Sequence, residues 1–107
     1  MLQSNIRRYL RHGMLPQLRV FEAVSRHGNF TRAAEELCIA QPTVSVQIRK
    51  LTETVGMPLL ENAGRRVRPT AAGHQLYCAC REIFGTLAAV EEALSLLRLR
   101  PAPGREP

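Results

Sequence analysis

The segment 30–49, FTRAAEELCIAQPTVSVQIR, constrains the fold more than any other part of the chain, because it has the pattern of two short helices joined by a tight turn. Thr31 stands where an N-cap residue is expected, just ahead of Ala33 and Ala34, whose small side chains let another helix approach closely. Pro42 suits the first turn of the second helix. The segment therefore predicts a helix-turn-helix.

The second of these helices is expected at 42–55 and has two unlike faces. Its apolar residues recur at spacings of four, three and four, which places them on one side of an α-helix. They are Val44, Ile48, Leu51 and Val55. On the opposite side Val46 lies among polar and basic residues, and Glu53 is the only acid before the end of the helix. An ordinary solvated face would mix acids with bases, whereas an outward valine can pack against thymine methyl groups. The pattern favours contact with the DNA major groove.

Composition and charge are consistent with a small binding module. A chain of 107 residues has room for one domain with a modest core. The formal net charge of +6 suggests a polyanionic partner. Three cysteines, an odd number without metal-finger spacing, indicate a reducing cytoplasm. No apolar run is long enough to cross a bilayer, so no membrane association is expected. Phosphate-loop, nucleophile-elbow and zinc-protease motifs are missing, so no enzyme, no catalytic residue and no cofactor is predicted.

The cysteines leave one alternative open. His74 and Cys78 lie four residues apart and Cys80 is near, so a metal or redox sensor is conceivable. A metal needs further ligands, which this neighbourhood does not offer, and no metal site is predicted. Cys38, between the two short helices, is expected to pack as a small hydrophobe.

The flanks of the helix-turn-helix are expected to be a basic tail, a first helix and a hairpin. Residues 1–13 carry positive charge without the apolar block of a signal peptide. A helix is expected at 16–27, with a broad apolar face. A short strand at 58–61, turn residues at 62–65 and a return strand at 66–68 predict a hairpin. Three arginines lie in and just after its tip, as in a wing that reaches a neighbouring minor groove.

A long helix is expected over 71–99, spanning roughly 40 Å at 1.5 Å per residue. Its apolar residues alternate at spacings of four and three, as in a coiled-coil seam. The seam consists of Leu76, Cys80, Ile83, Leu87, Val90, Leu94 and Leu97. One part should cover the core, together with Tyr77 and Phe84, but the distal part projects too far to be buried by so small a domain. A partner helix is the simplest cover, which predicts a homodimer on a pseudo-palindromic site.

Taken together, these motifs resemble the N-terminal domain of LysR-type transcriptional regulators over about residues 14–97. The resemblance is carried by Leu18, Phe21, Gly28-Asn29-Phe30-Thr31-Arg32-Ala33-Ala34, Leu37, Gln41-Pro42, Ser45, Gln47-Ile48, Leu51, Gly56, Pro58-Leu59-Leu60-Glu61 and Thr70-Ala71-Ala72-Gly73. It implies a mostly α fold, with a winged helix-turn-helix of three helices and a two-stranded wing over 14–70. A long C-terminal dimerising linker helix would follow. The amino-acid sequence of the helix-turn-helix is most similar to that of the carbon-fixation operon regulators.

The resemblance also implies a function and partners. A cytoplasmic bacterial regulator would bind an interrupted dyad in double-stranded promoter DNA, usually as a dimer of dimers in the full-length protein. Full-length members bind a small-molecule effector through a further domain, which is absent from this chain. Residues 100–107 would then be the start of the hinge to that domain.

Carried over by position, the family's contact residues fall on three parts of the chain. The groove contacts fall on Gln41, Pro42, Thr43, Ser45, Val46 and Gln47. The backbone contacts fall near Thr31, Arg32, Arg49 and Lys50, and the wing contact falls on Arg65 or Arg66. Three positions depart from the family pattern. Val46 replaces a frequent arginine, which implies an apolar or weak base preference. Asn62 replaces the usual arginine at the start of the wing, which puts one phosphate contact in doubt. Ala40 replaces a common serine, which removes a hydroxyl cap.

An alternative of another class is a protein-interaction module. In that case the chain would be a helical dimeriser whose basic face binds an acidic partner, without a role at a promoter. Sequence-specific retention of DNA discriminates the two functions.

Overall fold

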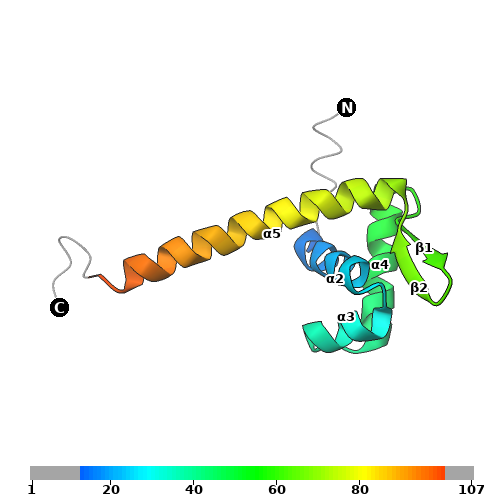
Figure 1. The fold of residues 1–107 in the computed structure, drawn as a ribbon, viewed down its shortest axis with the longest axis horizontal. Helices are drawn as coiled ribbons and strands as arrows, with labels where there is room; N and C mark the ends of the chain where they lie inside the picture. The colour runs from blue at the N-terminus through cyan, green and yellow to red at the C-terminus, as the bar shows by residue number, and fades with distance from the viewer. Residues whose placement is uncertain (1–12, 101–107) are drawn as a thin grey trace.

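The computed structural model describes residues 13–100, which form a helical bundle, a small hairpin and one projecting helix (Figure 1). The elements in order are α2 (Met14–His27), α3 (Phe30–Leu37), α4 (Gln41–Val55), β1 (Leu60–Ala63), β2 (Arg66–Pro69) and α5 (Ala71–Arg98). The strand β2 of the hairpin contacts α2 and α5, and α5 crosses α2 and then extends away from the bundle (Figure 1). The expected fold class, a mostly α winged helix-turn-helix with a long C-terminal helix, is confirmed. The basic tail and the hinge lie outside the described residues, except for Gly13 and Arg100.

The core lies where α2, α3 and α4 meet and is closed by the first half of α5. Its largest fully buried side chains are Phe21, Leu51, Leu59, Val24, Val44 and Cys80. The apolar stripe predicted along α4 is confirmed at Val44, Ile48 and Leu51, and Val55 is half-buried. Both alanines of α3 are also buried, because their small side chains leave room for the neighbouring helices.

The N-cap of α3 is Asn29, and the expectation of a Thr31 cap is wrong. The Oδ1 atom of Asn29 accepts a hydrogen bond from the backbone N–H of Arg32 at 2.8 Å. The backbone of Asn29 is extended, as an N-cap requires, and the helix begins at Phe30. Thr31 therefore lies inside the first helical turn, where its hydroxyl is exposed.

Two other helices begin slightly earlier than the sequence indicated. α4 starts at Gln41, one residue before Pro42, and α2 starts at Met14 rather than Pro16. A proline in the first turn of a helix needs no N–H partner, so both prolines fit there. Ala40, the N-cap of α4, provides no side-chain hydrogen bond, as its replacement of serine implied.

Cys38 ends α3 in the left-handed region, with φ of 58°. Its backbone N–H donates to the carbonyl oxygen of Glu35 at 3.3 Å, which closes the last turn of the helix. The turn into α4 needs this backbone conformation, and the thiol stays exposed. The expected packing of Cys38 as a small hydrophobe is therefore wrong.

The hairpin is tighter than the sequence indicated. Ala63 pairs with Arg66, which leaves Gly64 and Arg65 as a two-residue turn. Gly64 has φ of 70°, as such turns require. β1 both begins and ends two residues later than predicted, so Asn62 lies within a strand and not in the turn.

A network of charged side chains joins α2, α3 and α5. The guanidinium of Arg26 binds the carboxylates of Glu22 at 2.9 Å and of Glu36 at 2.6 Å. Arg81 of α5 reaches Glu22 at 3.4 Å, and His27 Nε2 lies 2.6 Å from Glu36. Glu22 is buried, so its charge is tolerated only because these partners surround it. The network therefore holds the three helices in one arrangement.

The start of α5 is fastened to the loop before the hairpin. The Thr70 hydroxyl accepts the N–H of Gly73 at 3.0 Å and donates to the carbonyl oxygen of Pro58 at 2.8 Å. The backbone N–H of Thr70 also donates to the carbonyl oxygen of Leu59 at 3.0 Å. A Cβ atom on Gly73 would lie only 2.0 Å from that same oxygen. Only glycine allows the helix to approach the loop so closely.

The two glycines of α5 should respond to alanine in opposite directions. Gly73→Ala forces the Leu59 backbone to move, and we expect it to lower the free energy of unfolding by about 2 kcal/mol or more. Gly85→Ala meets no atom within 4 Å and should raise it by up to about 1 kcal/mol, because alanine favours a helix. Urea unfolding followed by circular dichroism measures both changes. Equal changes in the two variants would contradict the contact at Gly73.

The ion pairs of Glu36 should make the free energy of unfolding depend on pH. Hydrogen bonds from Arg26 and then His27 lower the pKa of Glu36 from 4.5 to about 2. Because the folded pKa is the lower one, the stabilisation is fully present above about pH 4.5 and is lost as the pH falls towards 2. We expect Glu36→Gln to be less stable than the parent near pH 7, with a difference that shrinks in acid.

Urea unfolding at several pH values measures this difference. Glu35→Gln is the matched control, because the Glu35 carboxylate forms no ion pair within residues 13–100. If the Glu36 and Glu35 variants showed the same pH dependence, the ion pairs would not be the cause.

Candidate nucleic-acid interface

The outward face of α4 consists of the residues predicted for it. Burial of Val44, Ile48 and Leu51 turns the opposite side of the helix to solvent. Gln41, Pro42, Thr43, Ser45, Arg49 and Lys50 are exposed, and Val46 and Gln47 are half-buried. Basic and neutral polar groups with one central valine therefore form an accessible surface without acids up to Glu53.

The first turn of α3 presents two more of the predicted residues. Thr31 and Arg32 are both exposed, and α3 packs against α4. The N-terminus of a helix carries a partial positive charge, and the Arg32 guanidinium adds a full one. This end of α3 has the electrostatic character that phosphate groups prefer.

The wing arginines differ in what they bind. The Nη2 atom of Arg66 donates to the backbone carbonyl oxygen of His27 at 3.3 Å, and Arg68 pairs with Glu61 at 2.9 Å. Arg65, in the turn, is exposed and forms no hydrogen bond or ion pair within residues 13–100. Both positions predicted for the wing contact are exposed, and of the two only Arg65 has no partner within residues 13–100.

The seam predicted along α5 is divided in two by the fold. Leu76 is half-buried against the core, and Cys80 is fully buried, with its Sγ atom 3.7 Å from the carbonyl oxygen of Leu18. Burial, followed by the nearby Glu22 carboxylate, raises the pKa of the Cys80 thiol to about 11. Cys80 therefore belongs to the part of the seam that covers the core, and its assignment to the dimer contact is wrong, because α2 already covers it.

The distal seam residues remain uncovered by the described part of the chain. Their exposed fractions are 38% for Ile83, 50% for Leu87, 48% for Val90, 43% for Leu94 and 59% for Leu97. This part of α5 extends beyond the bundle (Figure 1). A row of large apolar side chains left in water is typical of a surface that meets another protein.

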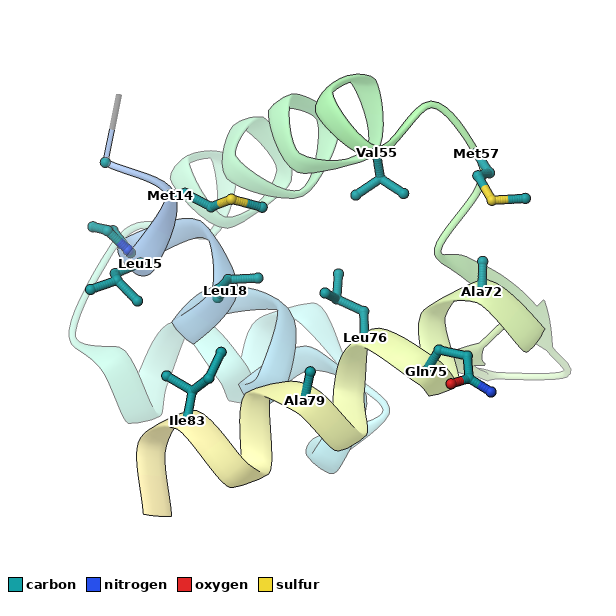
Figure 2. Close-up of a pocket in the computed structure, with 12 residues that line it drawn as sticks. Met14, Leu15, Leu18, Val55, Met57, Ala72, Gln75, Leu76, Ala79 and Ile83 are labelled. Carbon is teal, nitrogen blue, oxygen red and sulfur yellow. The ribbon is translucent and has the colours of Figure 1, made fainter. Parts of the chain in front are cut away.

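An apolar groove of about 850 Å³ opens beside this row (Figure 2). It lies between the start of α2, the end of α4 and the first half of α5, and the seam residues Leu76 and Ile83 point into it. Sequence reasoning missed this groove. Met14, Val55 and Met57, which also line it, come from helix ends and a loop that only the fold brings together.

The open alternative of a metal sensor at His74 and Cys78 finds no further ligands in the described residues. His74 Nε2 and Cys78 Sγ lie 3.7 Å apart on the exposed side of α5. Within residues 13–100 no three side chains of His, Cys, Asp or Glu gather closely enough to hold a metal ion. In the same range no helix is both long and apolar enough to span a membrane.

Comparison with known sequences places the chain among bacterial regulators. The RuBisCO operon transcriptional regulator of Allochromatium vinosum is 47% identical over 87 residues, which cover 81% of this chain and 29% of that protein. The regulator of the same name from Acidithiobacillus ferrooxidans is 43% identical over 89 residues, covering 83% and 29%. The chain thus spans less than a third of the length of these curated relatives.

Solved structures of similar fold include complexes with DNA. The crystal structure of the BenM_DBD/catB site 1 DNA complex is 40% identical, with a TM-score of 0.68, covering 86% of this chain and 98% of that chain. The CbnR_DBD–DNA complex is 35% identical, with a TM-score of 0.66, covering 80% and 98%. The family model described as bacterial regulatory helix-turn-helix protein, lysR family, matches residues 15–74. The chain therefore belongs to the lysR family of bacterial regulatory helix-turn-helix proteins, a class of transcriptional regulators and not of enzymes.

Proposed function

We propose that this chain is the DNA-binding part of a cytoplasmic transcriptional regulator and that it recognises an interrupted dyad in promoter DNA. One observation carries the proposal: α4 buries its apolar stripe and presents a solvent-facing side without acids up to Glu53. The related BenM_DBD and CbnR_DBD structures, of the same fold, are complexes with DNA. A net charge of +6 further favours a polyanionic ligand.

Each part of the interface has its own role in this proposal. The side chains of Ser45 and Gln47 read base edges in the major groove, and Val46 packs against thymine methyl groups. Phosphate groups are bound by Thr31, Arg32, Arg49 and Lys50, which fix the register without reading the sequence. The tip of the wing enters the adjacent minor groove.

The distal half of α5 supports a homodimer. Its exposed leucine and valine row is continuous with the apolar groove beside α2, so a second copy of the helix has a long apolar surface to cover. A two-fold dimer presents two copies of α4 to the two halves of a dyad.

We propose the rest of the regulator from the resemblance to the family. Because the chain spans 29% of their length, we place a small-molecule effector domain in the remainder and the start of its hinge at residues 100–107. The association of two dimers into a dimer of dimers is proposed for that longer protein. The first promoter to examine lies upstream of a RuBisCO operon, since both relatives are named for such an operon.

Substitutions on the face of α4 should separate base readout from phosphate binding. We expect Gln47→Ala or Ser45→Ala to relax preference at one or two base pairs, at a cost of about 1–3 kcal/mol in discrimination. Arg49→Ala should weaken all duplexes alike and reduce the slope of log affinity against log salt by about 0.9. Fluorescence anisotropy with promoter, single-base variant and scrambled duplexes measures both effects.

The scrambled duplex also tests the proposed function itself. Equal affinity of the parent protein for promoter and scrambled DNA would favour the alternative, a module that binds an acidic protein partner. Equal and unselective losses from all three variants would contradict the roles assigned to them.

A charge in the distal seam should abolish the dimer. We expect Leu94→Asp to give monomers in sedimentation velocity, because burial of an unpaired carboxylate between two helices is unfavourable. Leu96→Asp is the matched control: Leu96 is also exposed but lies outside the seam, so its variant should remain dimeric. Persistence of the dimer in Leu94→Asp would refute α5 as the contact.

A further inference from the structure

The end of α2 is where the wing meets the rest of the domain. The last carbonyl groups of a helix lack intrahelical partners and carry a partial negative charge. Here the His27 carbonyl oxygen accepts from the Arg66 guanidinium at 3.3 Å. The Gly28 carbonyl oxygen accepts from the backbone N–H of Val67 at 3.1 Å. Two successive residues of β2 thus satisfy two successive carbonyl groups at the helix end.

Gly28 leaves the space that the Arg66 side chain occupies. A Cβ atom at this position would lie 2.7 Å from Nη2 and 2.9 Å from Nε of Arg66. Gly28 also has φ of 66°, a conformation that side chains disfavour. The same glycine therefore ends α2 and admits the guanidinium against it.

We propose that Arg66 is a positioning residue, which fastens the wing to the end of α2 and thereby places Arg65 for DNA contact; the role rests on the proposed function. Arg66 forms the last strand pair before the turn, directly after Arg65 in the chain. An anchor there restricts the turn residue, since consecutive Cα atoms are about 3.8 Å apart. A two-stranded hairpin is marginal by itself, and this anchor adds to the packing of Leu60 and Val67 against the core in holding one orientation.

A double-substitution cycle on DNA affinity tests whether Arg66 acts through Arg65. Affinities for the promoter duplex are measured for Arg65→Ala, Arg66→Ala and the double variant. Arg65→Ala and Arg66→Ala should each weaken binding. In the Arg65→Ala background, Arg66→Ala should add less than about two-fold, because the residue that it positions is already gone. Fully additive losses would overturn the proposal and make Arg66 a direct DNA contact.

Hydrogen exchange in the free protein tests the anchor without DNA. The Val67 amide, which donates to Gly28, should exchange several-fold faster in Arg66→Ala, while the core amide of Leu51 keeps its rate. Arg65→Ala is the matched control and should leave the Val67 amide unchanged. An unchanged Val67 rate in Arg66→Ala would show that no anchor exists.

The two measurements separate failure of this inference from failure of the proposed function. If the parent protein does not distinguish promoter from scrambled duplex, the proposed function is overturned, and the positioning role with it. If it does distinguish them, but the cycle is additive or the Val67 amide is unaffected, only the role of Arg66 is overturned.

Discussion

The interface depends on one constraint, which is the fixed orientation of α4 about its long axis. Val44, Ile48 and Leu51 are buried against the neighbouring helices, and at about 100° per residue their burial determines which side chains face solvent. Removing one such core side chain typically costs about 2–5 kcal/mol, a large part of the stability of a small domain. The helix therefore cannot turn its outward side inward without losing the fold.

Polar contacts add to the apolar packing that holds the wing and α5. The wing has two short strands, and its position depends on the packing of Leu60 and Val67 against the core together with backbone hydrogen bonds to Gly28 and Leu59. Glycines at 28 and 73 permit these close approaches. Buried Glu22 ties α5 to α2 and, through Arg26, to α3. The positions of the wing and of the long helix are therefore both fixed relative to α2.

The two halves of α5 have different roles despite one continuous apolar pattern. In the first half Leu76 and Cys80 close the core: within one copy Cys80 is fully buried and Leu76 is half-buried. In the second half Leu87 and Leu94 extend beyond the bundle and stay exposed. The heptad spacing is the same in both halves. Spacing shows only that residues share one face of the helix, and it does not show whether the domain core or a partner helix covers that face.

The sequence by itself determined the element order, the stripe of α4 and its outward residues, because helical periodicity and turn chemistry are local. Only the tertiary structure decided that Cys80 packs on Leu18, that Arg66 binds the end of α2, and that a groove opens beside the seam. Each of these joins residues about forty or more positions apart. Local patterns carry no information about such contacts, since only the folding of the whole chain brings the partners together, by packing and by hydrogen bonds.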